Sequence, residues 1–340
     1  MQGIEVDRVG DWLVHNVAGA VAPFTYSLIA GGRSNLTFLV CDGAGHQFVL
    51  RRPPLGHVLA TAHDMVREHR IIAAVGRTDV PVPQALAVCA DDAINGAPFY
   101  VMAYVPGVVL DSAERAAAMK VETRRRSSEH LIDVLADLHA VDVDTVGLGD
   151  LAKREGYIER QVKRWSAQWG NSKTRELAAI DEVAARLQTR IPEQRHVAIV
   201  HGDYRFGNCL TDVDTGCINA VLDWELCTLG DPLADVGYLG VYWFDGVPAH
   251  ARANDPTSGG GFPSYDDLLQ RYSLRTGRDL AEIDYYVAFS CWRLAVITEG
   301  VYARYLRGAM GDQPGTDLDG FKIGTEQLAE RALTAIRRLT

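Results

Sequence analysis

The segment that decides the fold is His201-Gly202-Asp203-Tyr204-Arg205-Phe206-Gly207-Asn208, and Asp223-Trp224-Glu225 begins fifteen residues after its end. Short apolar runs at 197–200 and 220–222 border the polar loop and predict strands that hold Asp203, Asn208 and Asp223 at one edge. Phosphoryl transfer requires a carboxylate that orients the attacking hydroxyl, together with oxygen ligands that hold magnesium against nucleotide phosphates. These three side chains supply all of those groups.

Other readings of the same residues are possible. Aspartate and asparagine are common turn residues, so any one of the three could simply serve a turn. The ordered set, followed by Asp231-Pro232-Leu233-Ala234-Asp235, favours chemistry. A metallohydrolase could use His201 and Asp203, but the remaining histidines are spread singly. A catalytically inactive nucleotide-binding module is the main non-enzyme alternative, and the presence of all three polar side chains argues against it.

The composition narrows the class of protein. The chain has 340 residues, of which 47% are hydrophobic and 23% charged, so we expect a folded protein of two units or two lobes. A net charge of −10 disfavours nucleic acid and membrane surfaces as partners. The first residues lack a signal-peptide pattern, no segment approaches about 18 uncharged apolar residues, and the six cysteines contain no Cys-x-x-Cys pair. We therefore expect a soluble, cytoplasmic protein without a Cys-x-x-Cys metal or redox centre.

The hydrophobic periodicity predicts an α+β fold in two parts. Alternating or apolar runs bounded by glycine and proline predict strands, and apolar stripes at helical spacing predict helices. The first hundred residues are expected to form a helix at 5–17, strands at 27–30, 36–40, 47–51, 84–89 and 99–105, and a main helix at 57–75. After Pro106 and Gly107 the pattern becomes mainly helical, which places the boundary near 103–107.

Together, His-Gly-Asp-x-x-x-x-Asn, Asp-Trp-Glu and Gly-Asp-Pro-x-x-Asp resemble the aminoglycoside phosphotransferase and choline kinase superfamily. The sequences at 222–235 and 300–305 resemble more specifically one branch of this superfamily, whose members are often fused to, or encoded beside, acyl-CoA dehydrogenases. The resemblance implies a bilobal protein-kinase-like fold, with a nucleotide-binding lobe at 1–103 and a catalytic, acceptor-binding lobe at 104–340. It also implies ATP and Mg²⁺ as cofactors and a small hydroxylated molecule as the acceptor. Rival Walker A, Rossmann and Gly-x-Ser-x-Gly motifs are absent from the sequence.

The resemblance also implies roles for individual residues of this chain. Asp203 would be the catalytic carboxylate, and Asn208 and Asp223 would be magnesium ligands. His201 would brace the loop, and Asp235 would accept hydrogen bonds from the loop backbone.

A glycine-containing turn at 31–35 lies between two predicted strands. Glycine lets backbone amides approach phosphate oxygens closely, which makes Gly32, Ser34 and Asn35 candidates for nucleotide binding. A plain hairpin turn explains the same residues equally well. By resemblance, Met102 and Tyr104 would form the hinge against the adenine.

The third strand offers Arg51 or Arg52 where protein kinases carry a lysine. Glu68 lies on the apolar stripe of the following helix, three residues after Met65, and a carboxylate there requires a partner. We expect Arg51 to form the ion pair that positions the nucleotide phosphates. The alternative is a solvated Glu68 at the edge of the stripe.

The sequence gives less information about the chemical class of the acceptor than about the reaction. Residues 151–170 are enriched in basic side chains, and Arg164, Arg293 and Arg304 are candidates to contact an anionic acceptor such as a hydroxy acid or a hydroxyacyl-CoA. Solvated helix positions and interior stacking explain these arginines as well. An aminoglycoside-type antibiotic kinase is the alternative function.

Overall fold

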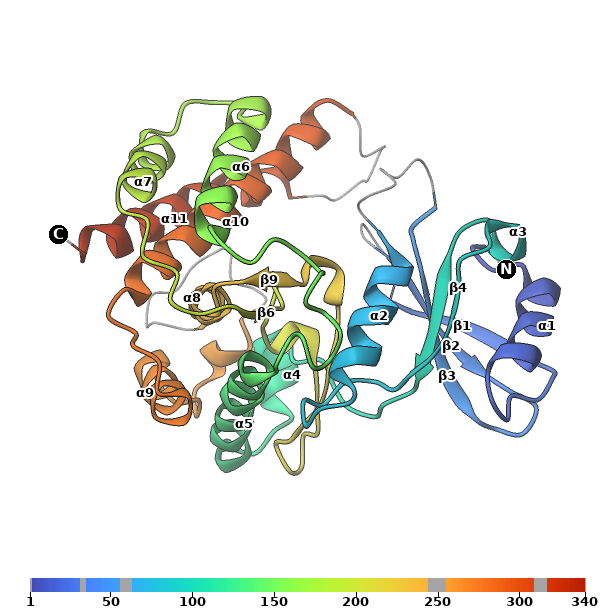
Figure 1. Ribbon diagram of the computed structural model, residues 1–340. Coiled ribbons are helices and arrows are strands. Elements are labelled where there is room, and N and C mark those ends of the chain that lie inside the picture. The colour runs from blue at the N-terminus through green and yellow to red at the C-terminus, as the bar shows by residue number, and fades with distance from the viewer. Residues whose placement is uncertain (1, 31–34, 56–62, 244–254, 309–316, 340) are drawn as a thin grey trace.

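The protein has two lobes, a small one built around a sheet and a large one built mainly of helices (Figure 1). The computed structural model describes residues 2–30, 35–55, 63–243, 255–308 and 317–339. A five-stranded antiparallel sheet in the first lobe and a mainly helical second lobe confirm the predicted α+β, protein-kinase-like fold.

The small lobe contains an antiparallel sheet of five strands in the order β1-β2-β3-β5-β4. Its strands are β1 (Thr25–Ala30), β2 (Leu36–Cys41), β3 (Gln47–Arg52), β4 (Ala85–Cys89) and β5 (Phe99–Ala103). Its helices are α1 (Val6–Asn16), α2 (Met65–Val75) and the short α3 (Asp92–Asn95). The predicted helix at 57–75 therefore begins only at Met65, where the Asp64 side chain accepts a hydrogen bond from the Arg67 backbone amide. Residues 56–62 lie outside the described part.

Alternation along β3 assigns its side chains to two faces of the sheet. Phe48 and Leu50 belong to the hydrophobic cluster that includes α1, whereas Val49 belongs to the cluster that includes α2. Figure 1 shows α2 on the side of the sheet that faces the large lobe and α1 on the far side. By the same alternation, Arg51 lies on the α2 face and Arg52 on the α1 face.

The large lobe is formed by helices that pack around two short hairpin-like ladders. The α-helices are α4 (Ala113–Ala117), α5 (Val121–Ala140), α6 (Tyr157–Ser172), α7 (Ala178–Thr189), α8 (Leu233–Val241), α9 (Tyr265–Thr276), α10 (Ile283–Leu306) and α11 (Leu318–Arg337). The strands are β6 (Ala198–Val200), β7 (Cys209–Thr211), β8 (Ile218–Val221) and β9 (Thr228–Gly230), and the 3₁₀ helices are η1 (Phe206–Asn208), η2 (Trp224–Leu226) and η3 (Pro256–Gly259). None of the helices in the described ranges is long and apolar enough to cross a membrane.

The ladders β6–β9 and β7–β8 position the loop at 201–208. The loop leaves β6 and enters β7 through η1, while β8 leads to Asp223 and η2. β7 also meets the segment that follows β5, because Val108 and Thr211 form an isolated bridge. The loop therefore lies close to the connection between the two lobes.

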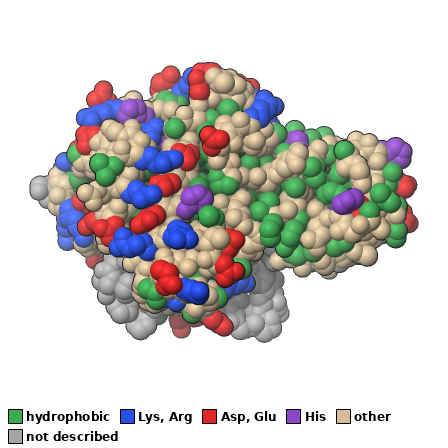
Figure 2. Space-filling view, turned by 90° about the horizontal axis from the view of Figure 1, so that it is seen from below, with side chains coloured by type: hydrophobic (Ala, Val, Ile, Leu, Met, Phe, Trp, Pro, Cys, Tyr) green, Lys and Arg blue, Asp and Glu red, His purple; other side chains and the backbone are tan. Residues whose placement is uncertain are grey.

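On the outside of the large lobe, acidic and basic side chains alternate between α5 and α9. Arg271 forms an ion pair with Asp133, and Arg275 forms one with Asp137. Figure 2 shows that basic and acidic side chains are intermingled on this face of the large lobe. Such exposed ion pairs contribute little stability, roughly 0 to 1 kcal/mol each. Because each pair joins one acidic and one basic side chain, this face carries both signs of charge.

Candidate active site

Asp203 and Asn208 are joined directly in the loop between β6 and β7. The Asn208 Nδ2 group donates to the Asp203 Oδ2 atom at 2.6 Å and to the Asp203 carbonyl at 2.8 Å. These bonds fix the amide so that Asn208 Oδ1 points away from them, with no hydrogen bond to the described residues. The loop thus holds one carboxylate against one amide group and leaves the amide oxygen free for another partner.

His201 braces this loop from beneath. Its Nδ1 atom accepts a hydrogen bond from the Asp203 backbone amide at 3.2 Å, and its Nε2 atom lies 2.9 Å from the Leu222 carbonyl. Both contacts are satisfied together by the neutral tautomer that carries its proton on Nε2. The buried ring thus links Asp203 to the residue that precedes Asp223, in agreement with the predicted bracing role.

Asp235 anchors the same loop from α8. Its two carboxylate oxygens accept hydrogen bonds from the backbone amides of His201 at 2.6 Å and Gly202 at 2.8 Å. Burial by itself would raise the pKa of Asp235, but the hydrogen bond from His139 and those backbone amides lower it below its usual value. The carboxylate therefore stays ionised, which confirms the predicted contact with the loop backbone.

Gly202 is required at its position for two reasons. Its φ angle is +85°, a left-handed conformation that residues with a side chain rarely adopt. A Cβ atom there would lie 2.9 Å from the Leu226 carbonyl oxygen. This close approach explains why glycine stands where many protein kinases have an arginine.

Asp223 follows β8 after one intervening residue, Leu222, whose carbonyl contacts the His201 ring. Its φ angle of 64° is the one positive value found for a non-glycine residue in the described ranges, and strained backbone of this kind is typical of functional sites. Its Oδ1 atom pairs with the Arg51 guanidinium, which reaches across from the small lobe. The pair joins β3 to the loop that follows β8.

The predicted ion pair between Arg51 and Glu68 is confirmed. Arg51 Nε lies 3.2 Å from Glu68 Oε2, and the Tyr100 hydroxyl donates to the same oxygen at 3.2 Å. Only 1% of Glu68 is exposed, which excludes the solvated alternative. Arg52 instead donates to the backbone carbonyls of Gly3 and Asn95 on the other face of the sheet, so Arg51 is the arginine that faces the large lobe.

The cluster around Asp223 has more negative than positive charge. Asp223, Glu68 and Glu225 gather near Arg51, and burial together with the charge of Asp223 raises the pKa of Glu225 to about 7. An added cation would relieve this repulsion. No group of three or more His, Cys, Asp or Glu suited to a metal is found among the described residues. Magnesium held by one or two protein ligands, phosphates and water would not require such a group.

The remaining nucleotide candidates lie in the small lobe. Gly32 and Ser34 fall outside the described residues. Asn35 is buried, its Nδ2 group donates to Glu225 at 3.2 Å, and its Oδ1 atom has no partner. Met102 is buried in β5, opposite Val49 of β3, whereas Tyr104 follows the end of β5 and is 41% exposed. The segment that begins at Tyr104 therefore leaves the sheet at the junction between the lobes.

Arg205 is a site residue that the sequence analysis missed. Its Nε atom lies 3.4 Å from Asp203 Oδ1, and its guanidinium covers the Tyr242 ring at 4.8 Å from the centroid. The spacing of two residues from Asp203 in an irregular loop gives no periodic signal. Its position depends on a contact with Tyr242, which follows α8 and is distant in the sequence.

The three candidate acceptor arginines lie in different environments. Arg293 is 7% exposed, donates to the Gly202 carbonyl at 2.6 Å and covers the Tyr238 ring, so its side chain holds the loop. Arg164 is exposed on α6 and lies over Trp165. Arg304 is exposed on α10 and lines a cavity of about 320 Å³ between α6 and α10, together with Arg307. Arg293 therefore fits the alternative of interior stacking, whereas Arg304 faces the cavity between α6 and α10.

The fold and this junction define a class, the protein-kinase-like phosphotransferases, in which a sheet-bearing lobe faces a helical lobe that carries the catalytic loop. Residues 25–268 match the model of the phosphotransferase enzyme family, and the chain belongs to that family.

Two similar proteins agree with this assignment. Acyl-CoA dehydrogenase family member 10 of Mus musculus is 36% identical over 310 residues, covering 88% of this chain. The chain spans only 28% of that relative's length. A solved structure from Ralstonia eutropha, provisionally assigned as an aminoglycoside phosphotransferase, is 31% identical with a TM-score of 0.84 and covers 98% of both chains.

A more distant solved structure shares the fold alone. A spectinomycin phosphotransferase in complex with ADP and spectinomycin superimposes with a TM-score of 0.64 at 11% identity, covering 98% of each chain.

Proposed function

We propose that this protein is an ATP- and Mg²⁺-dependent small-molecule kinase that transfers the γ-phosphate to a hydroxyl group. Two linked contacts at the junction of the lobes carry the proposal. Asn208 is hydrogen-bonded to Asp203 in the loop, and Asp223 pairs with Arg51, which is itself paired with Glu68. In this proposal, residues 1–103 bind the nucleotide and residues 104–340 supply catalysis and acceptor binding.

The side chains at the junction of the lobes suit ATP and Mg²⁺ as cofactors. Asn208 Oδ1 and the Asp223 carboxylate would hold Mg²⁺, which neutralises charge on the transferring phosphate when bound. Arg51, held by Glu68, would contact the nucleotide phosphates. The unpartnered Oδ1 atom of buried Asn35 indicates a polar contact that the protein itself leaves unmade. The turn with Gly32 and Ser34 and the hinge with Met102 and Tyr104 complete the proposed nucleotide site.

Asp203 would orient the acceptor hydroxyl and accept its proton. The hydrogen bond from Asn208 and the backbone contact with His201 fix its carboxylate, so little reorganisation is needed at reaction. Arg205 lies beside the Asp203 carboxylate and helps to hold it in place. Asp203 is thus the proposed catalytic residue, and Arg205 is a positioning residue.

For the acceptor we propose an anionic hydroxy acid or its CoA thioester. The cavity between α6 and α10 is lined by Arg304, Arg307 and Trp165, and no Asp or Glu is among its lining residues. Arg304 lies eleven residues beyond Arg293, which is about 16 Å along the helix, so one acceptor that reaches both the loop and this cavity must be long. A CoA thioester has that length and charge, whereas a cationic aminoglycoside would be repelled by this cavity.

The direct test is an ADP-release assay with Mg²⁺ and ATP on hydroxyacyl-CoA thioesters, the matching free hydroxy acids, and kanamycin. We expect turnover with the thioesters or acids, and a drop of about a thousandfold in Asp203→Asn with ATP binding retained. Unchanged turnover in Asp203→Asn would refute the catalytic assignment. Efficient turnover of kanamycin alone would favour the antibiotic-kinase alternative.

A matched pair of variants tests the acceptor site. Arg304→Ala should raise the acceptor's KM about tenfold with little effect on ATP, because a charge-assisted contact contributes roughly 1.5 to 3 kcal/mol. Arg164→Ala is the matched test, since Arg164 is exposed on α6 but does not line the cavity. Equal effects of the two substitutions would show that the cavity is not the acceptor site.

A further inference from the structure

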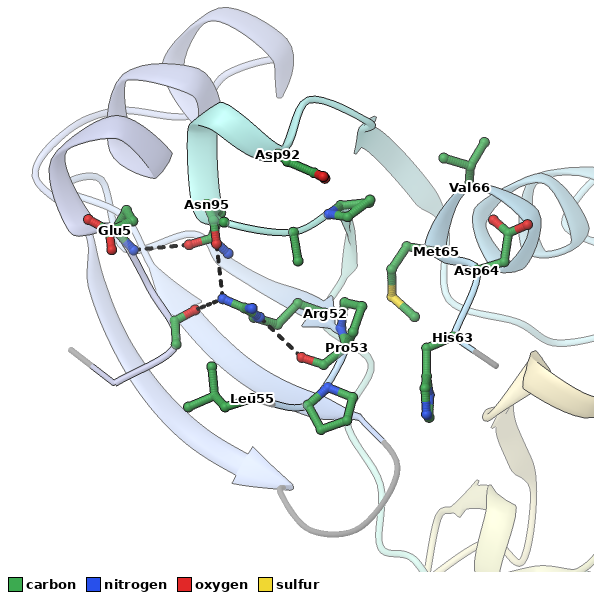
Figure 3. A pocket seen from close by; sticks show the side chains of 15 residues that line it. Glu5, Arg52, Pro53, Leu55, His63, Asp64, Met65, Val66, Asp92 and Asn95 are labelled. Carbon is green, nitrogen blue, oxygen red and sulfur yellow. Dashed lines mark hydrogen bonds between the residues drawn. The ribbon is translucent and has the colours of Figure 1, made fainter. Parts of the chain in front are cut away.

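The small lobe contains a second cavity, separate from the Asp203 site. It has a volume of about 780 Å³, within the range of small-molecule pockets. The end of β3, the start of α2 and the connection from α3 to β5 form its walls (Figure 3). None of its lining residues is a proposed catalytic, magnesium or nucleotide residue, although His63 on its wall lies 3.8 Å from Glu225 of the acidic cluster.

Arg52 forms the floor of this cavity. Its side chain is 6% exposed, and its Nε and Nη1 atoms donate to the backbone carbonyls of Pro53, Gly3 and Asn95. No carboxylate in the described ranges lies within ion-pair distance of it, although Glu5 is near enough to act on its charge. Nη2 has no hydrogen bond within the described protein. A buried guanidinium without a counter-ion is costly, because buried charges are normally paired.

Asn95 gives an independent observation at the same floor. Its Oδ1 atom accepts a hydrogen bond from the Glu5 backbone amide at 3.0 Å, which fixes the orientation of the amide group. The Nδ2 group then has no partner, although only 2% of the residue is exposed. Figure 3 shows Asn95 directly above Arg52 at the cavity wall. Two donors at the floor, Nη2 of Arg52 and Nδ2 of Asn95, therefore have no acceptor among the residues that the structure describes.

The rim of the cavity has the opposite character. Glu5, Asp64 and Asp92 line it and are exposed. The wall between the floor and the rim is apolar, with Leu55, Met65 and Val66 among its side chains, and Leu55 and Val66 are 47% and 43% exposed. A ligand that suits all three zones has an acidic group, an apolar body and a cationic group.

We propose that this cavity binds a zwitterionic apolar amino acid, or a short peptide of the same chemistry. The carboxylate lies on Arg52 and Asn95, the apolar side chain packs on Leu55 and Met65, and the ammonium group faces the acidic rim. The site lies at the start of α2, the helix that carries Glu68, so the ligand also stabilises that helix.

The first experiment uses phenylalanine as the probe on the full chain, with titration calorimetry in the absence of ATP. Phenylalanine amide lacks the carboxylate, and 3-phenylpropionate lacks the ammonium group. We expect phenylalanine to bind at least tenfold more tightly than either analogue, and to slow amide hydrogen exchange in α2. Absence of phenylalanine binding, or equal affinity for all three compounds, overturns the proposal.

The second experiment uses the rim, because replacing buried Arg52 could prevent folding. Asp92→Asn should weaken phenylalanine binding about threefold to tenfold and leave 3-phenylpropionate binding unchanged or tighter. Asp266→Asn, an exposed aspartate in the first turn of α9, is the matched control and should change neither. An equal effect of Asp92→Asn on both compounds overturns the assignment of the ammonium group. Both experiments are binding measurements, so they succeed or fail independently of kinase activity.

Discussion

The two sides of the candidate active site are stabilised in different ways. On the large-lobe side, Asp235 receives three hydrogen bonds inside the protein, and His201 uses both ring nitrogens. On the small-lobe side, Asn35 and Glu68 each keep a buried oxygen without a partner. The Asp235–His201 network is thus satisfied within the protein, while Asn35 and Glu68 keep oxygens available for a ligand.

This difference separates stability from binding. Substitutions in the large-lobe network should lower the free energy of unfolding, because they leave buried groups unpaired. Substitutions around Arg51 should change ligand binding more than stability, because removal of one carboxylate relieves crowded negative charge. The two groups of substitutions should therefore differ in whether they lower stability or ligand affinity.

The largest expected effect on stability is that of Asp235→Asn. The neutral amide cannot accept from both backbone amides and His139 as the carboxylate does, and hydrogen bonds to a charged group contribute about 1.5 to 3 kcal/mol each. We expect the free energy of unfolding to fall by about 3 kcal/mol in urea titrations. Loss of ATP affinity without loss of stability would contradict the proposed division.

Asp223→Asn should show the reverse pattern. Asparagine tolerates the positive φ angle of this position and keeps the size of the side chain, so the fold should lose less than about 1 kcal/mol. The charged magnesium ligand is removed, and we expect Mg²⁺-dependent ATP affinity to fall by tenfold or more. Titration of ATP with and without Mg²⁺ measures this, and wild-type affinity that does not depend on Mg²⁺ would refute the assignment.

Glu68→Gln tests the small-lobe pair with a smaller change. The amide fits the same space beside Tyr100 but no longer fixes Arg51 by charge. We expect the KM for ATP to rise about tenfold, while kcat changes less. Glu122→Gln, on an exposed position in the first turn of α5, is the matched control. An equal change in both variants would show that the Arg51–Glu68 pair has no special role.

The sequence predicted the parts of the site that follow a local period. The flanking short strands predicted that Asp203, Asn208 and Asp223 share one edge, the apolar stripe predicted a buried Glu68, and the resemblance supplied their roles. Arg51 was preferred over Arg52 as the partner of Glu68, and the alternation of β3 confirms that choice. The roles of these residues in nucleotide and metal binding remain predictions.

The features that the sequence did not predict depend on contacts between distant elements. Arg205 lies against Tyr242 only because α8 packs under the loop. Arg293 was a candidate acceptor contact with interior stacking as the alternative, and α10 directs it to the Gly202 carbonyl. The cavity above Arg52 is assembled from four segments that no periodic pattern connects.

The smallest expected effect is the pH dependence of the large-lobe network. Burial lowers the pKa of His139, and the hydrogen bond and charge of Asp235 only partly oppose this, so the folded protein holds a neutral imidazole. Asp231 also favours protonation, whereas Arg278 opposes it. The unfolded chain binds a proton near the usual histidine pKa of about 6.5, which the folded chain does not.

Stability from His139 is therefore fully present above that unfolded pKa and is lost as the pH falls below it. The depressed pKa of Asp235 acts in the same direction at lower pH, because its stabilisation is lost only as the pH falls through the folded pKa. We expect the free energy of unfolding to fall from pH 7.5 to pH 5.5, with His139 contributing about 1 kcal/mol. His139→Gln keeps a donor toward Asp235 and should flatten this slope, even if it lowers stability at every pH. An unchanged slope would show that His139 is already protonated in the folded protein, and the Asp235 contact would then be an ion pair rather than a neutral hydrogen bond.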